Sequence, residues 1–123
     1  MHAKKLTEAK TAYDNSIALS AKVPPETVRQ QSAFLMALTC RSNLYFSVDK
    51  NPQKARELSD LAFETAHRNG TAPLDVRTSL KERIILFRQL GIPNSEIDQL
   101  EHESQKYDRL RGKFRPDPEA LLQ

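Results

Sequence analysis

The sequence contains a single cysteine, Cys40, so no disulfide can form within the chain. Disulfides are rare in reducing compartments, and this scarcity predicts a cytoplasmic or nuclear location. Leu35, Leu38 and Leu44 lie near Cys40 in the sequence, which predicts that the thiol sits in a helix interior. Because no histidine follows Cys40 at a spacing typical of an activated nucleophile, we interpret it as a structural residue.

Glycine and histidine are also scarce. The three glycines are isolated from one another, so the chain has no glycine-rich loop of the kind that cradles phosphates. The three histidines, His2, His67 and His102, lie in different segments, and none shares a helix face with another metal-binding side chain. The carboxylates between residues 57 and 64 have basic neighbours, which is typical of a solvated helix face. We therefore expect no metal, no cofactor, no catalytic residues and no enzymatic activity.

Long hydrophobic runs are missing as well. The longest, such as residues 84–87, contain a few residues, far fewer than the ~20 that cross a bilayer. The first ten residues lack the apolar core of a secretory signal, so we expect no membrane partner. A chain of 123 residues is long enough for one domain. Its net charge of +3 is weaker than most DNA-binding domains carry.

What the sequence does have is helical periodicity. Apolar residues recur at spacings of three and four in five segments, and no alternating strand pattern occurs, which predicts an all-α protein. We expect a first helix that stops before Pro24, a second over about 26–48, a third from Pro52 to Asn69-Gly70, a fourth from Val76 to Gly91, and a fifth from Ser95. The second helix has large apolar residues on more than one face, so it should be the central element.

The predicted organisation is an antiparallel array of about five helices. Residues 1–93 should form a four-helix body, and residues 94–111 a peripheral fifth helix. The fifth helix carries a thin apolar stripe, which suits an outer position. Residues 112–123 contain two prolines and are expected to be a tail outside the body. On the third helix, Ala55, Ala62 and Ala66 predict close packing against a neighbour.

Three stretches resemble, in order, the last helices of 14-3-3 proteins. They read AYDNSIALSAK, then VRQQSAFLMALTCRSNLYFSVDKNPQKARELSDLAFETA, then SLKERIILFRQL, and they cover residues 11–90 approximately. The most specific piece is the corner at 52–55 that leads to Ala-Phe-x-x-Ala at 62–66, although tetratricopeptide-type repeats share this small-residue spacing. The resemblance implies an antiparallel helical array and a divergent or truncated relative of a phosphopeptide adaptor.

The sequence departs from that family at functional positions. Family members hold phosphoserine with basic residues from earlier helices, and the matching stretches include none of those helices. Cys40 stands where the family has an Asn that bonds the peptide backbone, with Asn43 one turn away, and Ser47 stands where the family has an acidic residue. The resemblance therefore implies an architecture more than a ligand.

Our leading hypothesis from the sequence is a non-catalytic module that binds another protein or peptide. If a partner binds along the second and fourth helices, Arg41, Tyr45, Arg83 and Arg88 are the candidate contacts. The competing interpretation is that these are surface residues without a role.

Two other functions stay open. The basic segment between Glu101 and Arg115 carries five cations against three acids, and its end could contact nucleic acid or an acidic partner. The candidate contacts there are Arg109, Arg111, Lys113, Phe114 and Arg115. The third hypothesis is a self-assembling subunit whose fifth helix pairs with a copy of itself.

Overall fold

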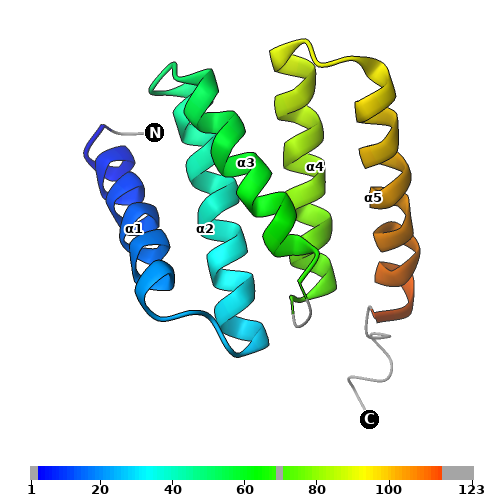
Figure 1. Ribbon diagram of the computed structural model, residues 1–123, viewed down its shortest axis with the longest axis horizontal. Coiled ribbons are helices and arrows are strands. Elements are labelled where there is room, and N and C mark those ends of the chain that lie inside the picture. Colours follow the sequence, from blue (N-terminus) through cyan, green and yellow to red (C-terminus); the bar gives the residue numbers. More distant parts are fainter. Residues whose placement is uncertain (1–2, 69–70, 115–123) are drawn as a thin grey trace.

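The computed structural model describes residues 3–68 and 71–114, with side chains for residues 4–68 and 71–108. Five α-helices make up this part of the chain, and it contains no strand (Figure 1). They are α1 (Ala3–Lys22), α2 (Val28–Ser47), α3 (Pro52–Ala66), α4 (Pro73–Leu90) and α5 (Asn94–Phe114). The predicted all-α class is confirmed. None of the described helices is long and apolar enough to span a membrane.

Successive helices run in opposite directions, so the array is antiparallel as predicted (Figure 1). α1, α2, α4 and α5 lie in a row, and α3 packs against both α2 and α4. α2 contacts α1, α3 and α4, which confirms that it is the central element. Among the described helices, α1 packs on α2 alone and α5 on α4 alone.

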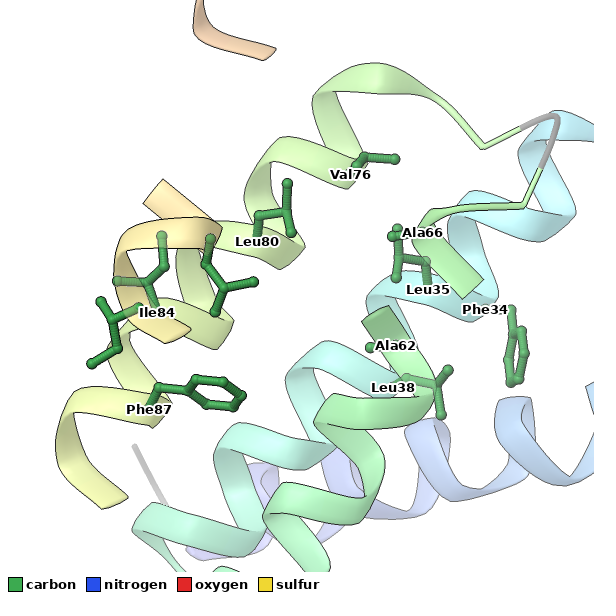
Figure 2. Close-up of a cluster of buried hydrophobic side chains, with 11 residues drawn as sticks. Phe34, Leu35, Leu38, Ala62, Ala66, Val76, Leu80, Ile84 and Phe87 are labelled. Carbon is green, nitrogen blue, oxygen red and sulfur yellow. The ribbon is translucent and has the colours of Figure 1, made fainter. Parts of the chain in front are cut away.

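The core lies where α2, α3 and α4 meet and continues to α5 (Figure 2). Leu35, Leu38 and Leu80 are almost completely buried, and each contributes roughly 1.5–3 kcal/mol by leaving water. Ile97 and Leu100 extend the same cluster onto α5. The stripe of small residues on α3 is buried as predicted, and it lets α3 lie close to α2.

The start of α2 differs from the sequence-based expectation. We expected the helix to begin near Glu26, with Pro25 in its first turn, but α2 begins at Val28 with Thr27 as N-cap. The Thr27 hydroxyl accepts the N–H of Gln30 at 3.1 Å. The Gln30 side chain in turn accepts the N–H of Thr27 at 3.3 Å. This reciprocal capping box satisfies the backbone N–H groups of Thr27 and Gln30 at the start of α2. Pro25 could not do so, because its side chain has no hydrogen-bond acceptor.

The helix ends agree with expectation in part. Asn51 caps α3 through its side chain, with Pro52 in the first turn, as predicted. α3 then ends at Ala66, and the predicted stop at Asn69-Gly70 lies outside the described residues. α4 ends at Leu90 and is capped by Gly91, as predicted; the φ of Gly91, 73°, is left-handed and suits glycine.

The limits of α5 also differ from prediction. The helix begins at Asn94, the first residue of the predicted segment 94–111, so Ser95 lies inside it. α5 continues to Phe114, past the expected end at residue 111. The structure of residues 115–123, the rest of the predicted tail, lies outside the described part.

Candidate functional site

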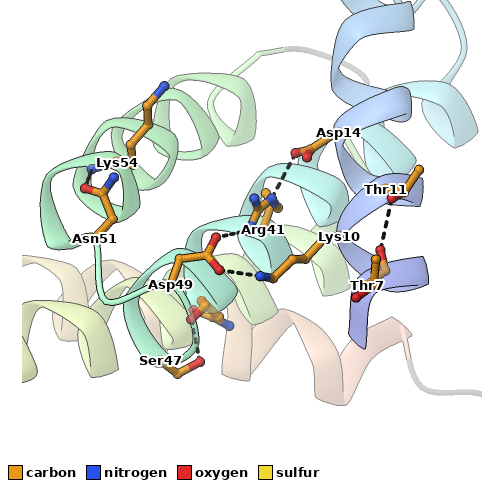
Figure 3. Close-up of polar contacts among 10 residues, drawn as sticks. Thr7, Lys10, Thr11, Asp14, Arg41, Ser47, Asp49, Asn51 and Lys54 are labelled. Carbon is orange, nitrogen blue, oxygen red and sulfur yellow. Dashed lines mark hydrogen bonds and ion pairs between the residues drawn. The ribbon is translucent and has the colours of Figure 1, made fainter. Parts of the chain in front are cut away.

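Arg41 is a buried residue at the centre of a cluster that joins α1 to α2 (Figure 3). The residue is 5% exposed. Its Nε donates to Asp14 Oδ1 at 2.9 Å, and its Nη1 donates to Asp49 Oδ2 at 3.1 Å. Lys10 of α1 also pairs with Asp49, and the guanidinium lies 3.7 Å from the centre of the Tyr45 ring. We call these five residues the Arg41 cluster.

The charges of this cluster stabilise one another. The hydrogen bond from Lys10, followed by that from Arg41, lowers the pKa of Asp49 against the opposing effect of burial. Burial acts to lower the pKa of Arg41, but the hydrogen bonds to Asp14 and Asp49 outweigh it and raise that pKa. None of the described α1 side chains is fully buried. The cluster is therefore a main attachment of α1 to the rest of the protein.

Cys40 lies beside the same interface. The thiol is partly buried. A hydrogen bond between Tyr13 of α1 and Cys40 raises the pKa of the tyrosine hydroxyl.

Arg83 forms a second, partly buried cluster between α4 and α3. Its Nη1 donates to Ser59 Oγ at 2.9 Å, and its Nη2 lies 2.9 Å from Asp60 Oδ1. The guanidinium sits over the rings of Phe63 and Phe87, at 4.7 and 4.4 Å from their centres. Burial lowers the pKa of Arg83, and the hydrogen bond to Asp60 opposes that shift. Arg83 thus pins α4 to α3 through polar and aromatic contacts.

Arg88 is the most exposed of the four candidate contacts, with 58% of its side chain accessible. It pairs with Glu101 and so bridges α4 and α5. Arg41 and Tyr45 lie together on the α1 side of α2, Arg83 faces α3, and Arg88 faces α5. The four residues therefore occupy three different interfaces instead of one groove. A role for them in partner binding stays a prediction.

Asn43 is also engaged within the chain. Its Nδ2 donates to Glu82 Oε2 at 2.9 Å, which links α2 to α4. One residue earlier, Ser42 Oγ donates to the carbonyl oxygen of Ala55 at 2.6 Å, which links α2 to α3. These hydroxyl and amide contacts could not be assigned from the sequence, since their partners are far away in the chain.

The basic end of α5 is described in its backbone alone. Arg109, Arg111, Lys113 and Phe114 lie in the last turns of the helix, but their side chains are outside the described part, as is all of Arg115. Just before them, Asp108 pairs with Arg77 and Lys81 of α4. Nucleic-acid or acidic-partner contact by this segment stays a prediction.

The structure reveals a surface feature that the sequence reading missed. Among the residues whose side chains are described, six large hydrophobic side chains are exposed. Four of them lie at or next to the C-terminal end of α1, the N-terminal end of α2 and the N-terminal end of α4: Leu19, Val23, Val28 and Leu74. These helix ends lie at the same end of the array (Figure 1). A hollow of about 220 Å³ opens there between α1 and α2. The helical periodicity of the sequence could not reveal this hollow, because the hollow depends on how neighbouring helices cross.

Among the described residues, no three His, Cys, Asp or Glu side chains are grouped so that they could hold a metal ion. His67, the residue after α3, pairs with Glu103 of α5, whereas His102 lies exposed on α5. The structure therefore keeps these two histidines in separate environments.

Comparison with family models, with curated proteins and with solved structures found no match.

Proposed function

We propose that this protein is a non-catalytic helical module that binds a segment of another protein. The observation that carries the proposal is the gathering of exposed Leu19, Val23, Val28 and Leu74 at one end of the array, beside an open hollow. Exposed apolar patches on soluble domains commonly mark interaction sites. The array supplies a rigid frame for such a patch.

The distribution of charge supports the same proposal. Arg41, Arg83 and Arg88 are each paired with a carboxylate on a neighbouring helix or corner. Their contacts hold neighbouring helices of this chain together. A module of this kind recognises a partner by shape and apolar contact more than by a single polar residue.

We further propose that the architecture is related to the last helices of 14-3-3 proteins. Three features support this: the antiparallel order of the helices, the central position of α2, and the Asn51-Pro52 corner that starts α3. Cys40 and Ser47 replace family positions, so we propose an adaptor-like role without assigning phosphate dependence.

Fluorescence anisotropy against degenerate serine-centred peptides, each phosphorylated and unphosphorylated, tests this function. Saturable binding of a subset of peptides supports a peptide-binding module, and a preference for the phosphorylated form would extend the likeness to adaptors. Labelled single-stranded RNA and DNA in the same assay test the basic end of α5. The proposed function fails if no peptide binds at on the order of 100 μM, or if nucleic acid alone binds.

A further inference from the structure

α1 is the least buried of the five described helices. None of its described side chains, those of residues 4–22, is buried, whereas each of the other four helices contains buried side chains. The described members of the buried core cluster all belong to α2, α3, α4 and α5, and α1 adds one partly buried residue, Ile17. Separation of α1 from the other helices would therefore leave most of this core in place.

The position of α1 in the array also allows it to separate alone. α1 lies at one end of the row and packs on α2 (Figure 1). A helix with one neighbour can leave without parting any other pair of helices. Proteins open locally in contiguous units whose free energies of opening are smallest where few apolar contacts are buried. By this criterion α1 is the unit that opens first.

The C-terminal end of α1 is loosely packed. Leu19 and Val23 are 62% and 64% exposed. Together with Phe34 of α2 they line the hollow of about 220 Å³ between the two helices, which we call the α1–α2 hollow. The stabilisation from apolar contacts scales with the apolar area removed from water. Apolar packing therefore contributes little to the docking of this end of α1.

The polar links of α1 lie nearer its other end, in the Arg41 cluster (Figure 3). Lys10 pairs with Asp49, and Asp14 pairs with Arg41. The side chain of Asp14 is 51% exposed, so water can replace Arg41 as its partner at small cost. Arg41 regains water when α1 leaves, and its second carboxylate, Asp49, lies beyond α1 in the corner after α2. The docking of α1 thus depends on ion pairs that can be broken and remade.

We propose that α1 opens away from α2 as a unit while α2, α3, α4 and α5 stay folded, and that the ion pairs of Lys10 and Asp14 set the fraction of open chains. Opening removes the α1 wall of the α1–α2 hollow. It also uncovers Cys40, which Tyr13 of α1 contacts in the closed state. The opening itself needs no partner, whereas its use to regulate binding at the hollow rests on the proposed function.

α5 is the internal comparison for this proposal. Like α1, it lies at an end of the row and, among the described helices, packs on one neighbour. Unlike α1, it places Ile97 and Leu100 in the buried core cluster. The first half of α5 should therefore stay docked when α1 opens, and the two end helices should differ in their protection from solvent.

Native-state hydrogen exchange of the full chain, followed by mass spectrometry at low urea, tests the opening. Backbone amides of residues 9–20 should exchange at least about tenfold faster than those of residues 97–104 and than those in the middle of α2 and α4. The exchange of α1 should also respond less to urea, because opening of one helix exposes less surface than global unfolding. Exchange of α1 at the rate and urea dependence of α2 would overturn the proposal.

Two neighbouring substitutions test the role of the ion pairs. Asp14→Ala removes the partner of Arg41 and should speed the exchange of α1 about threefold, with that of α4 unchanged. Asn15→Ala is the matched control, since it raises helix propensity in the same way but lies at an exposed position outside the cluster. It should not speed the exchange of α1. Equal effects of the two changes would overturn the proposal.

The single cysteine reports whether α1 leaves α2 or only unwinds in place. Because the chain contains one thiol, a thiol reagent gives one signal, that of Cys40. Asp14→Ala should raise its labelling rate by about the same factor as the exchange of α1, and Asn15→Ala should leave it unchanged. Faster exchange with an unchanged labelling rate would overturn the proposal. If Asp14→Ala does not fold, the exchange pattern of the wild-type chain decides.

The outcomes separate this inference from the proposed function. A serine-centred peptide that binds in the anisotropy assay should slow the exchange of α1, because the α1–α2 hollow exists in the closed state. If such a peptide binds and the exchange of α1 is unchanged, regulation through α1 is overturned and the binding module remains. If α1 opens as expected but no peptide binds, the opening is supported and the proposed function fails.

Discussion

Three arginine side chains connect neighbouring helices of this protein. Arg41 bridges α1, α2 and the corner before α3, Arg83 bridges α4 and α3, and Arg88 bridges α4 and α5. Arg41 and Arg83 also lie over aromatic rings. A planar guanidinium can donate to two carboxylates and stack at the same time, which a lysine cannot do. This chemistry explains why arginine occupies the buried positions.

Replacing Arg41 with alanine should destabilise the fold. The change removes packing under α1 and leaves Asp14 and Asp49 without their buried donor. Because both carboxylates are partly exposed, we expect a loss of about 1–3 kcal/mol in the free energy of unfolding, below the range for a fully buried pair. Urea unfolding followed by circular dichroism measures it. Arg29→Ala, an exposed change on the same helix, should stay within about 0.5 kcal/mol.

Asp49 should make stability depend on pH. Its pKa is lowered in the folded protein by Lys10 and then Arg41. A carboxyl with a lowered folded pKa stabilises the fold above its unfolded pKa of about 3.9, and this contribution is lost as pH falls through the folded value. Asp49→Asn should therefore be less stable than wild type at pH 7, and the difference should shrink with acidification below about pH 4.

The control for this titration is Glu57→Gln, on the exposed face of α3. Among the described residues Glu57 has no ion-pair partner, so the stability of Glu57→Gln should stay close to that of wild type across the same pH range. If the difference in the free energy of unfolding between wild type and Asp49→Asn stayed constant down to strong acid, this would contradict a titrating role for Asp49.

At the scale of helices and corners, the connection between α2 and α3 contains a strained residue. Lys50 has a φ of 54°, and it is the one described non-glycine residue with a left-handed backbone. A side chain with a Cβ atom costs roughly 1–2 kcal/mol there. The corner tolerates this because Asp49 is held by the Arg41 cluster on one side and Asn51 caps α3 on the other.

Lys50→Gly should therefore stabilise the protein by about 0.5–1 kcal/mol, since glycine relieves the strain but raises the entropy of the unfolded chain. Lys54→Gly, in the first turns of α3, should have the opposite sign and cost roughly 0.5–1 kcal/mol. Thermal unfolding of the two variants side by side measures both effects. A loss of stability in Lys50→Gly would show that the lysine side chain outweighs the backbone strain.

The helices themselves were well predicted from sequence because their signals are local. Apolar spacing located all five, and the Asn51-Pro52 start and the Gly91 stop were confirmed. The start of α2 was not: we expected it near Glu26, and the helix begins at Val28 with Thr27 as its N-cap. The reciprocal bonds of Thr27 and Gln30 decided between these two starts.

At the scale of the whole molecule, both ends of the row carry polar outer faces. α1 exposes Glu8, Thr11 and Asn15, and α5 exposes Gln99 and Lys106. Helical arrays need polar terminal faces to stay soluble. These polar side chains on the outer faces of α1 and α5 disfavour the packing of a further helix or a second copy against either end of the row.

This arrangement predicts a monomer in solution. Light scattering at tens of micromolar should give the mass of one chain, because the described side chains named above on the outer faces of α1 and α5 are polar. The mass should not change between low and high salt. A stable dimer would favour the third hypothesis, in which α5 pairs with itself, and Lys106→Leu would then strengthen it.

The sequence by itself determined the all-α class, the number and approximate limits of the helices, the central position of α2 and the small-residue packing of α3. These follow from spacing along the chain and from residues that act on their immediate neighbours. The tertiary structure alone decided what the candidate residues do. Arg41 and Arg83 became internal links and the α1–α2 hollow appeared, because partners such as Asp14, Asp60 and Phe34 reach them only when distant helices pack together.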